Sequence, residues 1–157
     1  MSRDSHKQQA IDGSGLRFAI AAAQFNGELV GALLERVQAR LASCGVKERN
    51  VRVVRVPGSN ELPVAAQLLA DAGRLDAVIA LGVIVRGDTI HYELIATAAT
   101  NGLMDVALES RIPVINGVVV AENESQARAR CNGRIDRGAE FADAALAMAA
   151  LRKTLTT

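Results

Sequence analysis

The feature that most constrains the fold is an apolar run from Ala77 to Val85, which contains no charged or hydroxyl-bearing side chain. Such a run is typical of a strand at the centre of a parallel sheet, where helices cover both faces. It is far too short to cross a bilayer as a helix, which takes about 20 apolar residues. The run therefore predicts an α/β domain built around a buried parallel sheet.

Shorter apolar runs, with helical periods between them, extend this pattern along the chain. We expect further strands over 16–23, 50–56 and 113–120. We expect helices over 28–44, from the turn at 57–60 to 72, over 90–109, over 124–131 and over 137–153. Gly45 and Gly73 directly follow two of these helices, where glycine commonly ends a helix. Successive strand–helix units with right-handed crossovers place helices on both faces of a parallel sheet.

The chain is poor in aromatic residues, with one Tyr, three Phe and no Trp, although 50% of it is hydrophobic. Its core must therefore consist of aliphatic and alanine side chains, which suits an α/β domain. We assign Phe18 and Phe141 to packing, and we expect Tyr92 to point away from its neighbour His91. The few rings and the formal net charge of +1 argue against nucleic acid and anionic membranes as partners.

Residues 1–15 form a polar leader without the apolar segment of a signal peptide. We expect this leader to be flexible, a single domain to span 16–157, and the protein to be cytoplasmic. Cys44 and Cys131 have neither a CxxC motif nor a metal-ligand spacing, so we expect two reduced thiols.

Ligands of open parallel sheets bind beyond the carboxyl ends of the strands. Four predicted turns should lie there, at 24–26, 58–61, 85–91 and 116–117. The sequence contains no P-loop, GxGxxG fingerprint, nucleophile elbow or metal-ligand cluster. Hydride transfer from a dinucleotide and metal catalysis therefore lack support.

His91 is the one histidine outside the leader, and it falls in the first turn of the helix after the most apolar strand. An imidazole there can transfer protons near neutral pH, or it can simply form a hydrogen bond at the start of the helix. Gly87, Asp88 and Thr89 precede it, and their backbone N–H groups can bind an anion at the helix N-terminus. Asp88 or Thr89 can equally cap the helix.

Three more features suit either a ligand or a structural role. Phe25 follows the first strand, where its ring either stacks on a planar heterocycle or folds back over the sheet edge. Glu61 can accept hydrogen bonds from sugar hydroxyls or serve as an acidic residue in a first helical turn. The four arginines within 128–137 can bind phosphate or form a solvated helix face.

Five segments together resemble the lumazine synthase family of riboflavin biosynthesis. They are Phe25-Asn26, the runs Pro57 to Pro63 and Gly82 to Glu93, Asn101 to Asp105, and Pro113 to Val118. The likeness covers residues 16–155, and the central segment is highly specific because strand, turn and histidine recur in the family's order and spacing. The resemblance implies a flavodoxin-like three-layer α/β/α sandwich with a four-stranded parallel sheet.

The resemblance also implies a transferase that joins 5-amino-6-(D-ribitylamino)uracil to 3,4-dihydroxy-2-butanone 4-phosphate, releasing phosphate and water without a metal or organic cofactor. It implies one set of residues for the pyrimidine substrate: Phe25 for stacking, Ser59, Asn60 and Glu61 for the ribityl chain, and the backbone of Val83, Ile84 and Val85 for the ring edge. It implies a second set for the butanone phosphate: Gly87, Asp88 and Thr89 at the phosphate, and His91 for proton transfer.

In this family the active site lies between adjacent subunits of a homo-oligomer. The resemblance implies that a neighbouring subunit contributes Arg130 to the phosphate and Asn116 to the pyrimidine. Family members assemble as pentamers or as shells of twelve pentamers. The segment 131–137 lacks the Gly-Lys-rich form of shell-forming members, which favours a free pentamer.

The chain departs from the family pattern at two positions. Many members carry an aromatic residue in place of Asn60 and Phe in place of Asn116. These polar replacements leave two alternatives open, a non-catalytic homologue that binds flavin or lumazine and a riboflavin synthase of the same fold. The phosphate turn and Arg130 argue against both, because neither alternative needs a phosphorylated substrate.

Overall fold

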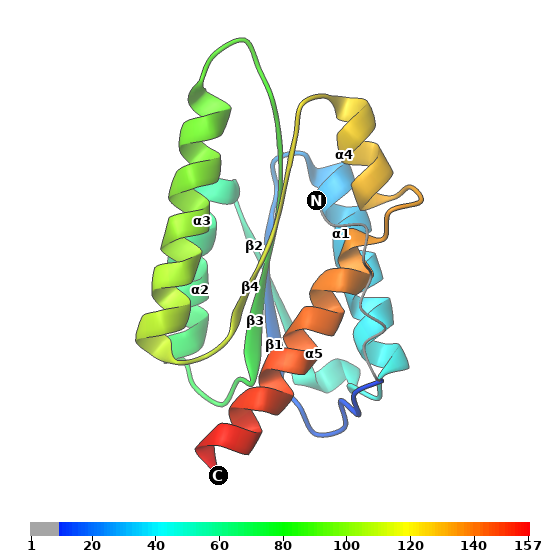
Figure 1. Ribbon diagram of the computed structural model, residues 1–157, viewed down its shortest axis with the longest axis vertical. Helices are drawn as coiled ribbons and strands as arrows, with labels where there is room; N and C mark the ends of the chain where they lie inside the picture. The colour runs from blue at the N-terminus through cyan, green and yellow to red at the C-terminus, as the bar shows by residue number, and fades with distance from the viewer. Residues whose placement is uncertain (1–9) are drawn as a thin grey trace.

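Four parallel strands form the middle layer of the computed structural model, which describes residues 10–157. They are β1 (Phe18–Ala23), β2 (Val51–Val56), β3 (Ala77–Val85) and β4 (Val114–Ala121). The strand order is β2-β1-β3-β4, and all three pairings are parallel. Helices cover both faces (Figure 1), so the predicted flavodoxin-like three-layer α/β/α sandwich is confirmed.

The helices divide unequally between the two faces of the sheet. One face carries α1 (Gly27–Ser43), α4 (Glu124–Cys131) and α5 (Arg137–Thr156), and the other carries α2 (Leu62–Asp71) and α3 (His91–Ser110). Two short 3₁₀ helices, η1 (Glu48–Asn50) and η2 (Ser59–Glu61), precede β2 and α2 and were not expected from the sequence. Within residues 10–157, none of the helices combines the length and apolar character that a membrane span requires.

The apolar run that defines β3 is buried on both faces, as its composition predicts. Ile79 and Leu81 pack with α1 and α5, whereas Val78 and Ala80 pack with α2 and α3. This division follows from the period of two in a strand, where successive side chains point to opposite faces. Phe18 and Phe141 lie in the core beside α1, so their assignment to packing is confirmed.

The predicted ends of the helices agree with the structure to within a few residues. In α1, the stripe Leu29, Leu33, Val37 and Leu41 is buried, as expected. Gly45 and Gly73 adopt φ angles of 89° and 77°, in the left-handed region that glycine reaches at little cost after a helix. Cys44 and Cys131 are free thiols. Residues 1–9 of the predicted flexible leader lie outside the described residues.

One predicted turn is wrong. The pair Asn116 and Gly117 does not end a strand but lies in the middle of β4, opposite Ala80 and Leu81 of β3. Apolar residues continue the strand after Gly117, and the ladder with β3 runs on to Ala121. A Cβ atom on Gly117 would lie 2.6 Å from the Ala80 carbonyl oxygen, so glycine marks a close approach here and not a turn.

Replacing this glycine should therefore destabilise the fold. We expect Gly117→Ala to lower the free energy of unfolding by about 1–3 kcal/mol, because the added methyl group would displace β3 backbone or Leu81. The matched control is Gly31→Ala within α1, where nothing lies within 4 Å of the added atom. There alanine should raise stability by up to about 1 kcal/mol. Urea unfolding at equal protein concentration measures both, and an unchanged midpoint for Gly117→Ala would contradict the expectation.

Candidate active site

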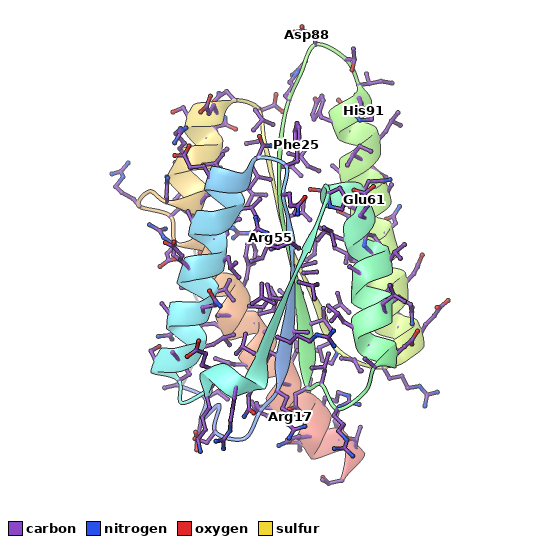
Figure 2. The ribbon with its side chains drawn as sticks, turned by 180° about the vertical axis from the view of Figure 1, so that it is seen from behind. Arg17, Phe25, Arg55, Glu61, Asp88 and His91 are labelled. Carbon is purple, nitrogen blue, oxygen red and sulfur yellow. The ribbon has the colours of Figure 1, made fainter. Side chains whose placement is uncertain are left out.

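A cavity of about 510 Å³ opens at the carboxyl ends of the strands. Its lining residues are Phe25, Asn26, Gly58, Ser59, Asn60, Glu61, Val83, Ile84, Val85, Gly87, Thr89, His91, Tyr92 and Ile95. Figure 2 shows Phe25, Glu61 and His91 together at this end of the sheet, far from Arg17 at the opposite end. Three of the four predicted turns therefore meet in one place.

Phe25 lies at the mouth of this cavity because the chain turns sharply after β1. The Phe25 backbone N–H donates to the Pro57 carbonyl at 3.0 Å, which joins two of the turns. Asn26 adopts φ 54°, and its Nδ2 donates to the Val83 carbonyl at 2.7 Å. The Phe25 ring is 72% exposed, so it does not fold back over the sheet edge.

Asn26 is a cavity residue whose individual role the sequence did not reveal. Asparagine is enriched in left-handed backbone conformations, and this was the one signal available. Asn26 directly follows the exposed Phe25, and its left-handed conformation turns the chain into α1. Its side-chain amide meanwhile bonds to the Val83 carbonyl.

The turn 58–61 is ordered by its own acidic residue. Glu61 Oε2 accepts a hydrogen bond from the Gly58 backbone N–H at 2.9 Å. A carboxylate has lone pairs for more than one donor, so Glu61 can still accept hydrogen bonds from a ligand. Ser59 is only 8% exposed and packs against Gly82 of β3, where a larger residue would collide with it.

The floor of the cavity is the end of β3, which extends beyond its neighbour β1. The ladder with β1 stops at the Ala22–Leu81 pair, whereas the ladder with β4 continues to Val85 and Ala121. One backbone edge of the residues after Leu81 is therefore not covered by β1. Val83, Ile84 and Val85 all line the cavity, as the resemblance implied for the residues that read a ring edge.

The loop between β3 and α3 closes one end of the cavity. Gly87 and Thr89 line it, but Asp88 lies at the tip of the loop, away from the Phe25 ring, as Figure 2 shows. Thr89 Oγ1 accepts from the His91 backbone N–H at 3.4 Å, but the N-cap position of α3 is Ile90, so neither Asp88 nor Thr89 occupies it. His91 is the first residue of α3 and is exposed toward the cavity.

The expectation that Tyr92 points away from the site is wrong, since Tyr92 lines the same cavity as His91. Its hydroxyl donates to Glu93 Oε1 at 2.8 Å, and this hydrogen bond raises the pKa of Tyr92. Arg86 lies over its ring, with Cζ 5.8 Å from the centroid. The ring therefore lies between Arg86 and the cavity, which the helical period alone did not indicate.

Asn116 and Arg130 do not line the cavity of their own chain. The Asn116 amide donates to Thr100 Oγ1 at 3.2 Å and accepts from the Val118 backbone N–H at 3.0 Å. Arg130 projects from α4, where it donates to the Gln126 carbonyl at 3.1 Å. Both positions are compatible with the implied contribution to a neighbouring subunit.

The other arginines of the segment 128–137 behave mainly as a solvated, ion-paired surface. Arg128 pairs with Glu28 at 3.0 Å and with Glu124 at 2.8 Å, and these carboxylates raise its pKa. Arg137 pairs with Glu140. Among residues 10–157, no group of three or more His, Cys, Asp or Glu side chains is arranged to hold a metal ion.

Comparison with known proteins identifies a family to which the sequence is similar. A family model described as 6,7-dimethyl-8-ribityllumazine synthase matches residues 15–153. Curated proteins of that name include one from Kineococcus radiotolerans, 48% identical over 149 residues that cover 93% of this chain and 91% of the relative. One from Thermococcus gammatolerans is 43% identical over 143 residues, 91% of this chain and 92% of the relative.

The hydrogen bond between Asn26 and Val83 can be tested by two substitutions that separate it from the backbone conformation. Asn26→Gly removes the hydrogen bond together with the Cβ atom, and should cost about 1 kcal/mol of unfolding free energy. Asn26→Ala also removes the hydrogen bond but keeps a Cβ atom in the left-handed region, and should cost about 1–2 kcal/mol more than Asn26→Gly. Urea unfolding of both variants measures the difference. Equal stability of the two variants would show that the φ angle carries no strain.

Proposed function

The chain belongs to the 6,7-dimethyl-8-ribityllumazine synthase family and is a transferase of riboflavin biosynthesis, and we propose that the cavity at the carboxyl ends of its strands holds both substrates. The reaction condenses 5-amino-6-(D-ribitylamino)uracil with 3,4-dihydroxy-2-butanone 4-phosphate. The observation that carries the proposal is the meeting of the Phe25, Ser59 and His91 turns around one cavity.

The pyrimidine ring binds between the Phe25 side chain and the end of β3. An exposed aromatic ring at a cavity mouth offers a planar face for stacking. Val83, Ile84 and Val85 lie at the polar edge of the heterocycle, where the part of their backbone that neither β4 nor Asn26 occupies supplies hydrogen-bonding groups. Ser59, Asn60 and Glu61 lie beside this floor and hold the ribityl chain, since their side chains complement hydroxyl groups.

The butanone phosphate binds at the loop Gly87, Asp88 and Thr89. This loop leads into α3, whose N-terminus presents the positive end of the helix dipole to a phosphate. His91 lies between this loop and the floor, where its imidazole transfers protons as the amine of the pyrimidine attacks the carbonyl group and as phosphate and water leave. Binding the two substrates close together in the reactive orientation supplies much of the rate enhancement.

Adjacent subunits of a homo-oligomer complete each site, with Arg130 at the phosphate and Asn116 at the pyrimidine. Two observations support this assembly. Neither residue lines the cavity of its own chain. The outer surface of α2 and α3 exposes several large apolar side chains, which are Val64, Leu68, Leu94, Met104 and Leu108. Exposed apolar patches of this kind mark interaction surfaces. The assembly we propose is a cytoplasmic pentamer.

The first test is to mix the purified protein with both substrates and follow lumazine formation by absorbance. The wild-type protein should exceed the uncatalysed rate. His91→Ala should lower kcat by up to about 100-fold, the lower end for general acid–base catalysis, while the affinity for the pyrimidine stays near that of the wild type. Equal loss of pyrimidine binding would make His91 a structural residue instead.

The shared site can be tested by complementation between subunits. Arg130→Ala should raise KM for the butanone phosphate about tenfold or more, because a charge-assisted pair is lost. The control Arg134→Ala, an exposed arginine of the same segment, should leave KM unchanged. Oligomers reassembled from Arg130→Ala and His91→Ala subunits should regain activity, since some sites then combine an intact Arg130 with an intact His91. No gain over the separate variants would contradict a site shared between subunits.

A further inference from the structure

Beside the loop 87–89, side-chain contacts join three residues to which the proposed function assigns no role. Arg86 Nη1 donates to Glu122 Oε2 at 2.9 Å. Its guanidinium carbon also lies 5.8 Å from the centroid of the Tyr92 ring. Arg86 follows β3, Glu122 follows β4 and Tyr92 lies in the first turn of α3. Arg86 therefore connects the end of the sheet to the start of α3, across the loop.

Both ends of this connection are anchored. The Arg86 backbone N–H donates to the Ala121 carbonyl at 2.9 Å, which continues the ladder between β3 and β4. The Glu122 backbone N–H donates to Gln126 Oε1 at 3.0 Å, which fixes Glu122 to the first turns of α4. On the other side, Tyr92 is held by its hydrogen bond to Glu93 at 2.8 Å. The position of the Arg86 guanidinium is thus determined by two strands and two helices.

The loop itself has little other support. A Cβ atom on Gly87 would meet nothing within 4 Å, and Asp88 is exposed at the tip. The hydrogen bond from His91 to Thr89 is long, at 3.4 Å. A loop that must become ordered when its ligand binds loses affinity to the entropy of ordering. Contacts that fix both ends of the loop in advance reduce this loss.

The charge of Arg86 is already balanced. Glu122 pairs with it and raises its pKa, and both side chains remain more than half exposed, at 57% and 59%. A guanidinium paired with a carboxylate offers a phosphate dianion little net charge. The geometry therefore favours a role through the loop over direct contact with the phosphate.

We propose that Arg86, held between Glu122 and the Tyr92 ring, is a positioning residue that preorganises the loop 87–89 for the phosphate of the butanone substrate. The inference rests on the proposed function of the cavity and adds residues outside the phosphate-binding set. It predicts an effect on one substrate, the butanone phosphate, because the contacts of Arg86 are with Glu122 and Tyr92, which flank this loop.

The test compares Arg86→Ala and Glu122→Ala with wild type in the lumazine assay. KM for the butanone phosphate should rise about three- to tenfold in each, since an exposed ion pair and a cation–π contact are together worth up to about tenfold in an equilibrium constant. The pyrimidine KM and kcat should stay within about twofold. The double variant should match the worse single variant, because both substitutions break the same contact. Glu124→Ala, which breaks the exposed Arg128 ion pair on α4, is the matched control and should change nothing.

The sign of the Glu122→Ala effect separates the two possible roles of Arg86. If Arg86 contacted the phosphate directly, removing its partner would free the guanidinium, and KM would fall or stay unchanged; either outcome overturns the proposal. Titration calorimetry with inorganic phosphate gives a readout that does not require turnover. Weaker phosphate binding in both variants supports preorganisation even if the wild type formed no lumazine, a result that would overturn only the function proposed for the cavity. Unchanged phosphate binding overturns the inference.

Discussion

The fold and the cavity both depend on the burial of β3 on its two faces. Fully burying an aliphatic side chain such as Ile79 or Leu81 is worth about 1.5–3 kcal/mol. Only helices on both sides of the sheet can supply that burial, so α1 and α5 must cover one face and α2 and α3 the other. A strand enclosed in this way leaves no polar surface along its length. Chemistry can appear only where the strand ends.

Unequal strand lengths make that end a site. Because β1 turns away after Ala23 while β3 continues to Val85, the sheet leaves a step at its carboxyl edge. Asn26 fills part of this step by bonding to the Val83 carbonyl, and the exposed Phe25 ring stands over the rest. The same step brings the turn at Ser59 against Gly82. If the strands ended level with one another, the edge of the sheet would offer no such step for these groups.

The sequence predicted the strand β3 to the residue and placed most helix ends within a few residues, since burial and glycine stops are local signals. It placed Phe25, Ser59 and His91 at one edge, because parallel strands all end on the same side. Prediction from the sequence was wrong where the role of a residue depends on a partner strand or side chain. Gly117 looked like a turn but permits the close contact with Ala80. Tyr92 was predicted to point away from His91 but lines the same cavity with Arg86 over its ring, a contact that no period in the sequence encodes.

The cavity of a single chain is not expected to bind a phosphate tightly, because it offers little positive charge. No lysine or arginine lines the cavity among the described residues, and the cation nearest to the phosphate loop in sequence, Arg86, is paired with Glu122. A helix N-terminus contributes only about half an elementary charge, which is too little to balance a phosphate dianion. This lack of positive charge is what the proposed contribution of an arginine by a neighbouring subunit would make good. Arg130 suits this role because its guanidinium has no carboxylate partner among the described residues and bonds only to a backbone carbonyl of its own helix. In the proposed assembly, subunit association and phosphate binding should favour each other, since the cation that completes the site belongs to the neighbour.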